Sequence, residues 1–127
     1  MTYVTFFYII LIGDDMDLVA IFIVGDNKQL LLKDNEPIFC KLLDSDKNYT
    51  DSIIREVKKY NLIIKSIDCL KWVIPYNYED KTYNLHTYIA YVNHSDLYEW
   101  YDLDRFIDKI NWSEDKELLK NKISNYL

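Results

Sequence analysis

A single helix-like segment interrupts a series of strand-like segments in this chain, and that order restricts the folds open to it. Residues 50–60 carry apolar side chains at helical spacing, on a stripe formed by Ile53, Ile54, Val57 and Tyr60. The apolar segments on either side are rich in β-branched and aromatic residues, which predicts strands. Because strands and helices do not alternate regularly, we expect an α+β protein with a mixed or antiparallel sheet.

The predicted strands are joined by turns and by two polar connections. Strands are expected at residues 3–12, 18–24, 29–32, 62–74, 83–92 and 97–100. Residues 33–48 show no clear period and are interpreted as a long loop that leads into the helix. Residues 76–81 are polar and are interpreted as the loop of a hairpin.

The helix ends are predicted from capping residues. Thr50 is the expected N-cap of the first helix, with Asp51 in its first turn, and Asn61 is the expected left-handed stop. Asp102 is expected to begin a short helix that reaches about residue 108, and Ser113 to begin a final helix. The predicted buried stripe of that final helix comprises Leu119, Ile123, Tyr126 and Leu127.

Composition and charge exclude several functional classes. The 127 residues, half of them hydrophobic, are sufficient for a single domain spanning residues 1–127. A net charge of −6 argues against general binding to the nucleic-acid backbone, which requires clustered cations. Residues 3–12 lack the features of a secretory signal and are shorter than the roughly 20 residues that cross a bilayer, so we expect no membrane association. Cys40 and Cys69 have no metal-ligand spacing and are expected to be free thiols, as in a cytoplasmic protein.

The first predicted helix contains the sequence Arg-Glu-Val at residues 55–57, which resembles the centre of the Nudix box. This box is the metal-binding signature of the nucleoside-diphosphate-X hydrolases. In the family pattern a Gly and a Glu precede this segment, and a pair of Glu follows it. The Gly position falls on Lys41, the first Glu on Lys47, and the closing pair on Lys59 and Tyr60. The chain therefore resembles an enzyme family while most of the expected acids are replaced.

A second segment supports the same resemblance. Trp100 and the residues after it are similar to the Trp-x-x-Leu-Asp/Glu segment that follows the last strand in many Nudix proteins. Residues 115–120 and 124–127 are similar to the end of the diadenosine tetraphosphate hydrolase branch. The resemblance covers residues 18–127, with residues 3–12 as the first strand. It implies a Nudix-like mixed sheet sandwiched between helices.

The resemblance implies a hydrolase that cleaves a pyrophosphate linkage with magnesium, which requires several carboxylate oxygens in near-octahedral geometry. Here the helix offers only Glu56, with Lys58 and Lys59 beside it. The family's further acid, near the end of a later strand, falls close to His94, which can act as a base but does not replace a metal shell. We therefore expect no bound metal, with magnesium needed only if hydrolase activity persists.

Arg55 is interpreted as a structural residue that holds the helix to the loop before it. In the family this Arg ties the helix to the preceding loop through carboxylates, and Asp44, Asp46 or Asp51 can serve that purpose here. The first two of these acids are also the alternative magnesium ligands if hydrolysis persists. Glu56 is then a remnant of the box or a partner for a Lys.

Residues near the predicted hairpin loop form a candidate nucleotide site. In the tetraphosphate hydrolase branch an aromatic residue of this region clamps an adenine, which indicates Tyr76 or Tyr78 here. Lys81, Lys58 and Lys59 are candidates for binding phosphate without metal, and His94 is a further candidate contact to the nucleotide. The alternative is that the lysines are solvated and the aromatic residues pack the sheet. That alternative also covers Trp72, Tyr83 and Tyr88.

Three hypotheses remain for the function. The first is a catalytically impaired Nudix-fold protein that binds an adenine nucleotide or dinucleotide, or a polyphosphate, without efficient hydrolysis. The second is a Nudix-derived interaction module within a protein or ribonucleoprotein assembly. Its old cleft would be filled, or its partner docked, by Ile38, Phe39, Leu42 and Leu43. The third is an active diadenosine tetraphosphate hydrolase with displaced acids, and the replaced acids argue against it.

Overall fold

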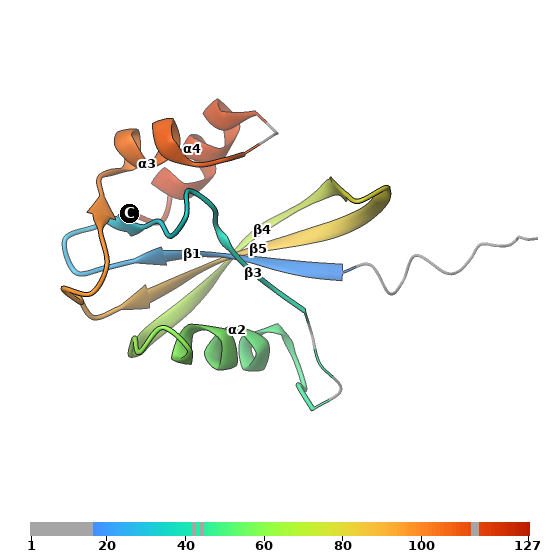
Figure 1. Ribbon diagram of the computed structural model, residues 1–127, viewed down its shortest axis with the longest axis horizontal. Coiled ribbons are helices and arrows are strands. Elements are labelled where there is room, and N and C mark those ends of the chain that lie inside the picture. The colour runs from blue at the N-terminus through green and yellow to red at the C-terminus, as the bar shows by residue number, and fades with distance from the viewer. Residues whose placement is uncertain (1–16, 42, 44, 113–114) are drawn as a thin grey trace, which may run out of the picture.

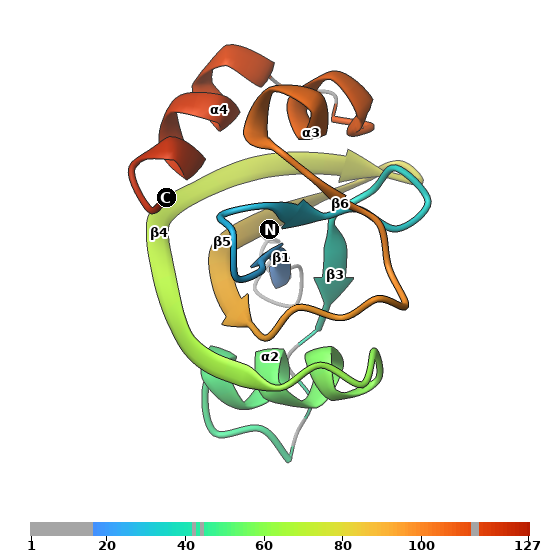
Figure 2. The same cartoon turned by 90° about the vertical axis from the view of Figure 1, so that its left-hand side faces the viewer.

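The computed structural model describes residues 17–41, 43, 45–112 and 115–127. One sheet lies between two helical layers, with α2 on one face and α3 and α4 on the other (Figures 1 and 2). The strand predicted at residues 3–12 lies outside the described residues. The elements are β1 (Asp17–Val24), β2 (Leu30–Leu31), β3 (Ile38–Cys40), α2 (Tyr49–Lys58), β4 (Ile64–Tyr78), β5 (Lys81–Val92), β6 (Trp100–Tyr101), α3 (Leu103–Lys109) and α4 (Lys116–Ser124).

The sheet is mixed. Its strands follow the order β4–β5–β1–β2–β6, and β3 pairs with β1. β1 runs parallel to β5, with Asp17 opposite Asn84 and Val24 opposite Tyr91. The other pairs between these strands are antiparallel. A buried parallel pair with antiparallel strands around it confirms the α+β mixed sheet predicted from the order of elements.

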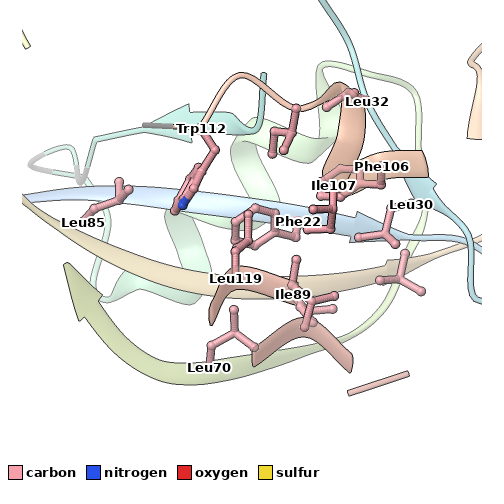
Figure 3. Packing of buried hydrophobic residues seen from close by; sticks show 14 of the residues in the cluster. Phe22, Leu30, Leu32, Leu70, Leu85, Ile89, Phe106, Ile107, Trp112 and Leu119 are labelled. Atoms are coloured by element: carbon pink, nitrogen blue, oxygen red, sulfur yellow. The ribbon is translucent and has the colours of Figure 1, made fainter. Parts of the chain in front are cut away.

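β1 is buried on both faces, so its side chains divide the core in two. Ala20, Phe22 and Val24 belong to the core beneath α3 and α4, and the residues between them belong to the core beneath α2. This division follows because successive side chains of a strand point to opposite faces. Figure 3 shows Phe22 with Phe106 and Trp112 beside it, at ring-centroid distances of 6.2 Å and 5.9 Å.

β4 contributes to both cores because it curves from the α2 layer to the α3–α4 layer (Figure 2). Ile64 and Ile67 pack against the core beneath α2, whereas Leu70 and Ile74 belong to the other core. Its register with β5 shifts in the middle of the strand, where Lys71 adopts a φ of 55°. Such an irregularity bends a strand and strengthens its twist, which allows one strand to serve two layers.

Helix α2 begins at a different cap from the one predicted. The Asn48 side chain accepts a hydrogen bond from the Asp51 amide at 2.9 Å, so the prediction of Thr50 as N-cap is wrong. Asn caps a helix as well as Thr does, and the earlier start brings Tyr49 into the helix. Asn61 adopts a φ of 57°, which confirms the predicted left-handed stop.

Only part of the predicted apolar stripe of α2 is buried. Ile53 and Val57 have no exposed surface and belong to the core, and Tyr60 is partly buried against it. Ile54, also on the apolar stripe, is 41% exposed and lies outside the core. The sheet covers a narrower strip of the helix than the spacing of apolar residues indicates.

The connection at residues 33–48 contains β3, so its interpretation as a loop throughout is wrong. Ile38 and Cys40 pair with Ile21 and Val19 of β1, and both side chains are buried. Three residues are too few for a period to be recognised in a sequence. Pairing with β1, the central strand, therefore sets the conformation of this short segment.

The hairpin between β4 and β5 is longer than predicted. The strands continue across most of residues 76–81, and only Glu79 and Asp80 form the turn. Their φ angles are 50° and 64°, and two successive positive φ angles are the mark of tight hairpin turns. The Thr82 hydroxyl donates to Asn77 Oδ1 at 2.8 Å across the pair. Polar side chains thus line a strand ribbon, which explains why these residues resemble a loop in sequence.

The two C-terminal helices have acidic caps. Asp102 accepts from the Arg105 amide at 2.9 Å and confirms the predicted start of α3. The N-cap of α4 is Asp115, which accepts from the Glu117 amide at 2.9 Å, so the prediction of Ser113 is wrong. Ser113 itself lies outside the described residues. In the predicted stripe of α4, Leu119 and Ile123 are buried, and Tyr126 and Leu127 are partly buried.

The last strand, β6, is shorter and later than the predicted strand at residues 97–100. Trp100 pairs with Leu31, and its ring lies over Gly25. A Cβ at Gly25 would approach the ring to 2.8 Å, so this contact requires a glycine. Within residues 17–41, 43, 45–112 and 115–127, no helix has the length and apolar character needed to cross a membrane.

Candidate functional site

Arg55 holds the loop before α2 against the helix. Its guanidinium donates to Asp46 Oδ2 through Nη1 and to the Lys41 carbonyl through Nη2 at 2.8 Å. Asp46 also accepts from the Leu43 amide at 2.8 Å. The bond from Arg55, followed by the bond from Leu43, lowers the pKa of the Asp46 carboxyl. Of the acids expected to partner Arg55, the structure identifies Asp46, and Asp44 lies outside the described residues.

Glu56 is the carboxylate that the helix keeps from the box pattern. Its side chain is 16% exposed, and its Oε1 accepts from Lys59 Nζ at 3.1 Å. The expectation of a lysine partner for Glu56 is therefore confirmed. Burial, followed by the Glu56 charge, raises the pKa of Tyr60, while the ammonium groups of Lys33 and Lys59 lower it. These four side chains form the Glu56 cluster. Lys33 comes from the connection after β2, so only the fold reveals it.

Aromatic side chains from the connection between β5 and β6 lie beside the end of α2. The Tyr98 hydroxyl donates to the Tyr60 carbonyl at 2.8 Å, and the two rings are 6.1 Å apart. Trp100 Nε1 donates to the Ser95 carbonyl at 2.8 Å, and its ring lies 5.4 Å from the His94 ring. Sequence reasoning missed Tyr98 and used Trp100 only as a fold signal, because nothing in the sequence places this connection beside α2.

His94 follows the end of β5 and is tied to the turn after β1. Its amide donates to Asp26 Oδ2 at 3.2 Å, and its Nε2 lies 3.0 Å from Asp96 Oδ1. Asp26 also accepts from Lys65 Nζ at 2.6 Å. That bond, followed by the bond from the His94 amide, lowers the pKa of the Asp26 carboxyl. The polar partners of His94 in these contacts are thus carboxylates.

The predicted nucleotide-binding residues fall into two groups at opposite ends of the sheet (Figure 1). The first group, at the end of α2 and after the end of β5, comprises Lys58, Lys59 and His94. The second group, in the β4–β5 hairpin, comprises Tyr76, Tyr78 and Lys81. β5 has 12 residues, so its ends are roughly 36 Å apart at about 3.3 Å per residue. The structure does not bring the six residues into one site.

The hairpin aromatic residue Tyr76 lies on the face of the sheet opposite α2. It packs against the core beneath α3 and α4, and its ring stacks on Phe39 at a centroid distance of 5.5 Å. One face of the Tyr76 ring is therefore occupied. Trp72 also packs against this core, and Tyr88 packs against the core beneath α2. These are the contacts expected if the aromatic residues serve the sheet.

Two pockets flank α2 and share Ile54 and Lys58. The first has a volume of about 380 Å³ and is lined mostly by polar and charged residues, namely Ser45, Asp46, Asp51, Ile54, Arg55 and Lys58. The second has a volume of about 330 Å³ and is mainly apolar, lined by Ile54, Lys58, Leu62, Ile63 and Ile64. The loop-holding side of α2 thus offers charged groups, and the junction with β4 offers apolar surface.

No family model and no curated protein sequence matches this chain. Solved structures do match it. A crystal structure of Caenorhabditis elegans Ap4A hydrolase superposes with a TM-score of 0.64 and 17% identity, covering 87% of this chain and 97% of that chain. A binary complex of C. elegans Ap4A hydrolase gives a TM-score of 0.59 and 15% identity, covering 87% and 96%. The chain has the Nudix hydrolase fold.

A third Nudix hydrolase structure agrees with this result. The solution structure of MutT from methicillin-resistant Staphylococcus aureus superposes with a TM-score of 0.57 and 21% identity, covering 88% of this chain and 97% of that chain. These identities are low, so the similarity concerns the fold. The Nudix-like mixed sheet between helices, expected from the resemblance, is confirmed.

The residues on the Nudix-like helix do not fit magnesium well. Mg²⁺ requires near-octahedral oxygen ligands, commonly from more than one carboxylate. Glu56 offers one carboxylate, which already accepts a hydrogen bond from the Lys59 ammonium. Lys47 and Tyr60 stand where the resemblance expects further acids. In the part of the chain that the structure describes, no three His, Cys, Asp or Glu side chains gather into a set that could hold a metal ion.

Proposed function

We propose that this Nudix-fold chain binds an adenine dinucleotide or a related polyphosphate and hydrolyses it inefficiently. The observation that carries the proposal is the pairing of Glu56 with Lys59, an ammonium group where the family pattern has an acid. The fold of the Ap4A hydrolases supports the nucleotide class. A lysine beside the remaining carboxylate supports phosphate binding over metal-assisted hydrolysis.

The polyphosphate contacts in this proposal come from the lysines at the end of α2. Lys59 would exchange its bond with Glu56 for phosphate oxygens, and Lys58 lies next to it, exposed. Lys33 approaches the same cluster from the connection after β2. Lysine is a point charge with rotatable donors, so it can follow a flexible phosphate chain without a fixed geometry. His94, on the same end of the sheet, is a further candidate contact.

The base contact in this proposal comes from an aromatic residue near the lysines at the end of α2. Tyr98, whose ring lies 6.1 Å from Tyr60, is an aromatic surface close to Lys59. Aromatic side chains stack on any base, which suits a site without base-specific hydrogen bonds. The proposed role of Tyr76, Tyr78 and Lys81 requires a second contact at the far hairpin. That hairpin lies at the other end of β5, roughly 36 Å away, and Tyr76 packs on the face opposite α2, so these residues are separate from the polyphosphate contacts of this proposal.

The test is native mass spectrometry of the full chain with diadenosine tetraphosphate and magnesium. The expected result is an intact adduct that persists over hours with little product. Rapid product formation would overturn the proposal in favour of an active hydrolase. The absence of both adduct and product would overturn it in favour of an interaction module. That second function is favoured by one observation, the exposure of Ile54 and Ile63 beside an apolar pocket.

A further inference from the structure

The end of the molecule where α2 gives way to β4 presents apolar surface to solvent. Ile63 is 66% exposed and Ile54 is 41% exposed. Together with Leu62 and Ile64 they line the mainly apolar pocket of about 330 Å³, which we call the Ile63 groove. Lys58 is the charged residue of the groove. Contiguous apolar surface on a small domain commonly marks an interaction site.

A second exposed apolar feature lies at the same end. Leu97, in the connection from β5 to β6, is 73% exposed and is the most exposed large apolar side chain that the structure describes. Its neighbour Asp96 has a fully exposed side chain. The connection is fastened beside the groove, because the Asn93 amide donates to the Ile63 carbonyl at 3.2 Å. Figure 1 shows the start of β4 and this connection at one end of the sheet.

The two features are complementary in chemistry. The Ile63 groove suits an apolar side chain with a carboxylate next to it, because its walls are isoleucine and leucine and its charged residue is Lys58. Lys58 has no ion-pair partner among the described residues. Leu97 and Asp96 offer that combination on adjacent positions. Within one chain Asp96 Oδ1 lies 3.0 Å from His94 Nε2, and its fully exposed carboxylate can also face the Lys58 of a second copy of the same chain.

We propose that two copies of this chain associate through this end, with Leu97 of each copy seated in the Ile63 groove of the other. Asp96 of each copy then pairs with Lys58 of the other. Because the groove and Leu97 lie at the same end, one rotation axis allows both contacts to form at once, as a self-complementary interface requires. Stacking the two grooves directly on each other would instead bring the two Lys58 side chains together.

The first test is sedimentation velocity of the full chain over about two decades of concentration, since a dimer must respond to mass action. The expected result is a shift from monomer to dimer as concentration rises. Ile63→Asp and Leu97→Asp should each raise the dimer dissociation constant by at least about tenfold. Val73→Asp is the matched control, because Val73 is 53% exposed but lies elsewhere on β4, and this variant should dimerise like the wild type.

The second test is a charge exchange. Lys58→Glu and Asp96→Lys should each weaken the dimer, and the double variant should recover affinity because the pair is restored with reversed sign. Circular dichroism confirms that each variant is folded. A wild-type chain that stays monomeric at every concentration would overturn the proposal and leave the groove to another protein. A dimer that Val73→Asp disrupts equally, or that the double variant fails to restore, would overturn it as well.

Discussion

The two sides of α2 keep very different shares of the Nudix pattern. On the loop-holding side, Arg55 binds Asp46 and the Lys41 carbonyl and fixes the preceding loop. On the other side, Glu56 remains, but its neighbour on the next turn is Lys59, which pairs with it. The first set of contacts maintains the shape of the chain, whereas in the second a lysine stands where the family pattern has an acid. Contacts that maintain a fold are costly to lose, and acids whose only partner is a metal can be replaced without unfolding the domain.

The largest expected effect on stability comes from truncating Ile53, which packs α2 against the sheet. Ile53→Ala should lower the free energy of unfolding by about 2–4 kcal/mol, because Ile53 is fully buried. Ile54→Ala, one residue further along and 41% exposed, should change it by less than about 1 kcal/mol. Urea denaturation at low protein concentration measures both. Equal losses would show that α2 does not present Ile53 to the sheet.

A second variant rebuilds the acid-bearing side. Lys47→Glu, Lys59→Glu and Tyr60→Glu together should create magnesium binding around Glu56, because several carboxylates then surround one position. We expect affinity at least about tenfold above that of the matched variant with Gln at the three positions, measured by calorimetry. A folded glutamate variant without any magnesium-dependent heat would show that the alignment of residues 41–60 with the box is wrong.

The Asp46 carboxyl on the loop-holding side of α2 leads to a prediction about how stability depends on pH. Hydrogen bonding holds the pKa of Asp46 below 3.8, so its contribution to stability is present above that pH and is lost as pH falls through the lower, folded value. The difference in melting temperature between wild type and Asp46→Asn should therefore be constant near neutral pH and shrink in strong acid. Asp34→Asn is the control, because Asp34 is largely exposed. A difference that grows on acidification would contradict the assignment.

The smallest effect is expected from a single lysine. Lys59→Gln should weaken diadenosine tetraphosphate binding by about three- to tenfold, in line with the loss of one exposed charge-assisted contact. Lys71→Gln is the control, since Lys71 is exposed in the middle of β4. Fluorescence or calorimetric titration reports both. Equal affinities for the two variants would remove Lys59 from the proposed phosphate contacts.

Much of the fold could be predicted from periodicity and capping. The β-branched, apolar run of β1, the helix around Ile53 and Val57, and the Asp102 cap all follow from local rules. β3 could not be found, because three residues show no period and owe their conformation to pairing with β1. The shift from Thr50 to Asn48 as N-cap reflects two residues of similar capping strength that stand two positions apart in the sequence.

The candidate site was less predictable than the fold. The family resemblance gave Arg55 a carboxylate partner among three nearby acids, and the lysines beside Glu56 made one of them a possible partner for it; the structure selects Asp46 and Lys59. The separation of Tyr76 and Lys81 from Lys59 depends on the length and direction of β5, which only the pairing with β1 reveals. The hydrogen bond from Tyr98 to the Tyr60 carbonyl, and the effect of the Lys33 charge on the pKa of Tyr60, arise from the tertiary fold, and no local sequence pattern predicts them.

The parallel pairing of β1 with β5 also has a kinetic consequence. The contact between Asp17 and His86 joins residues 69 positions apart, and the whole β1–β5 register has a similar separation. The β4–β5 hairpin, closed by the two-residue turn at Glu79 and Asp80, needs only a short loop. Because closing a long loop costs more entropy than closing a short one, the hairpin is expected to form early and the insertion of β1 to limit the folding rate. The same strand that divides the core would then be the last part of the sheet to take its place.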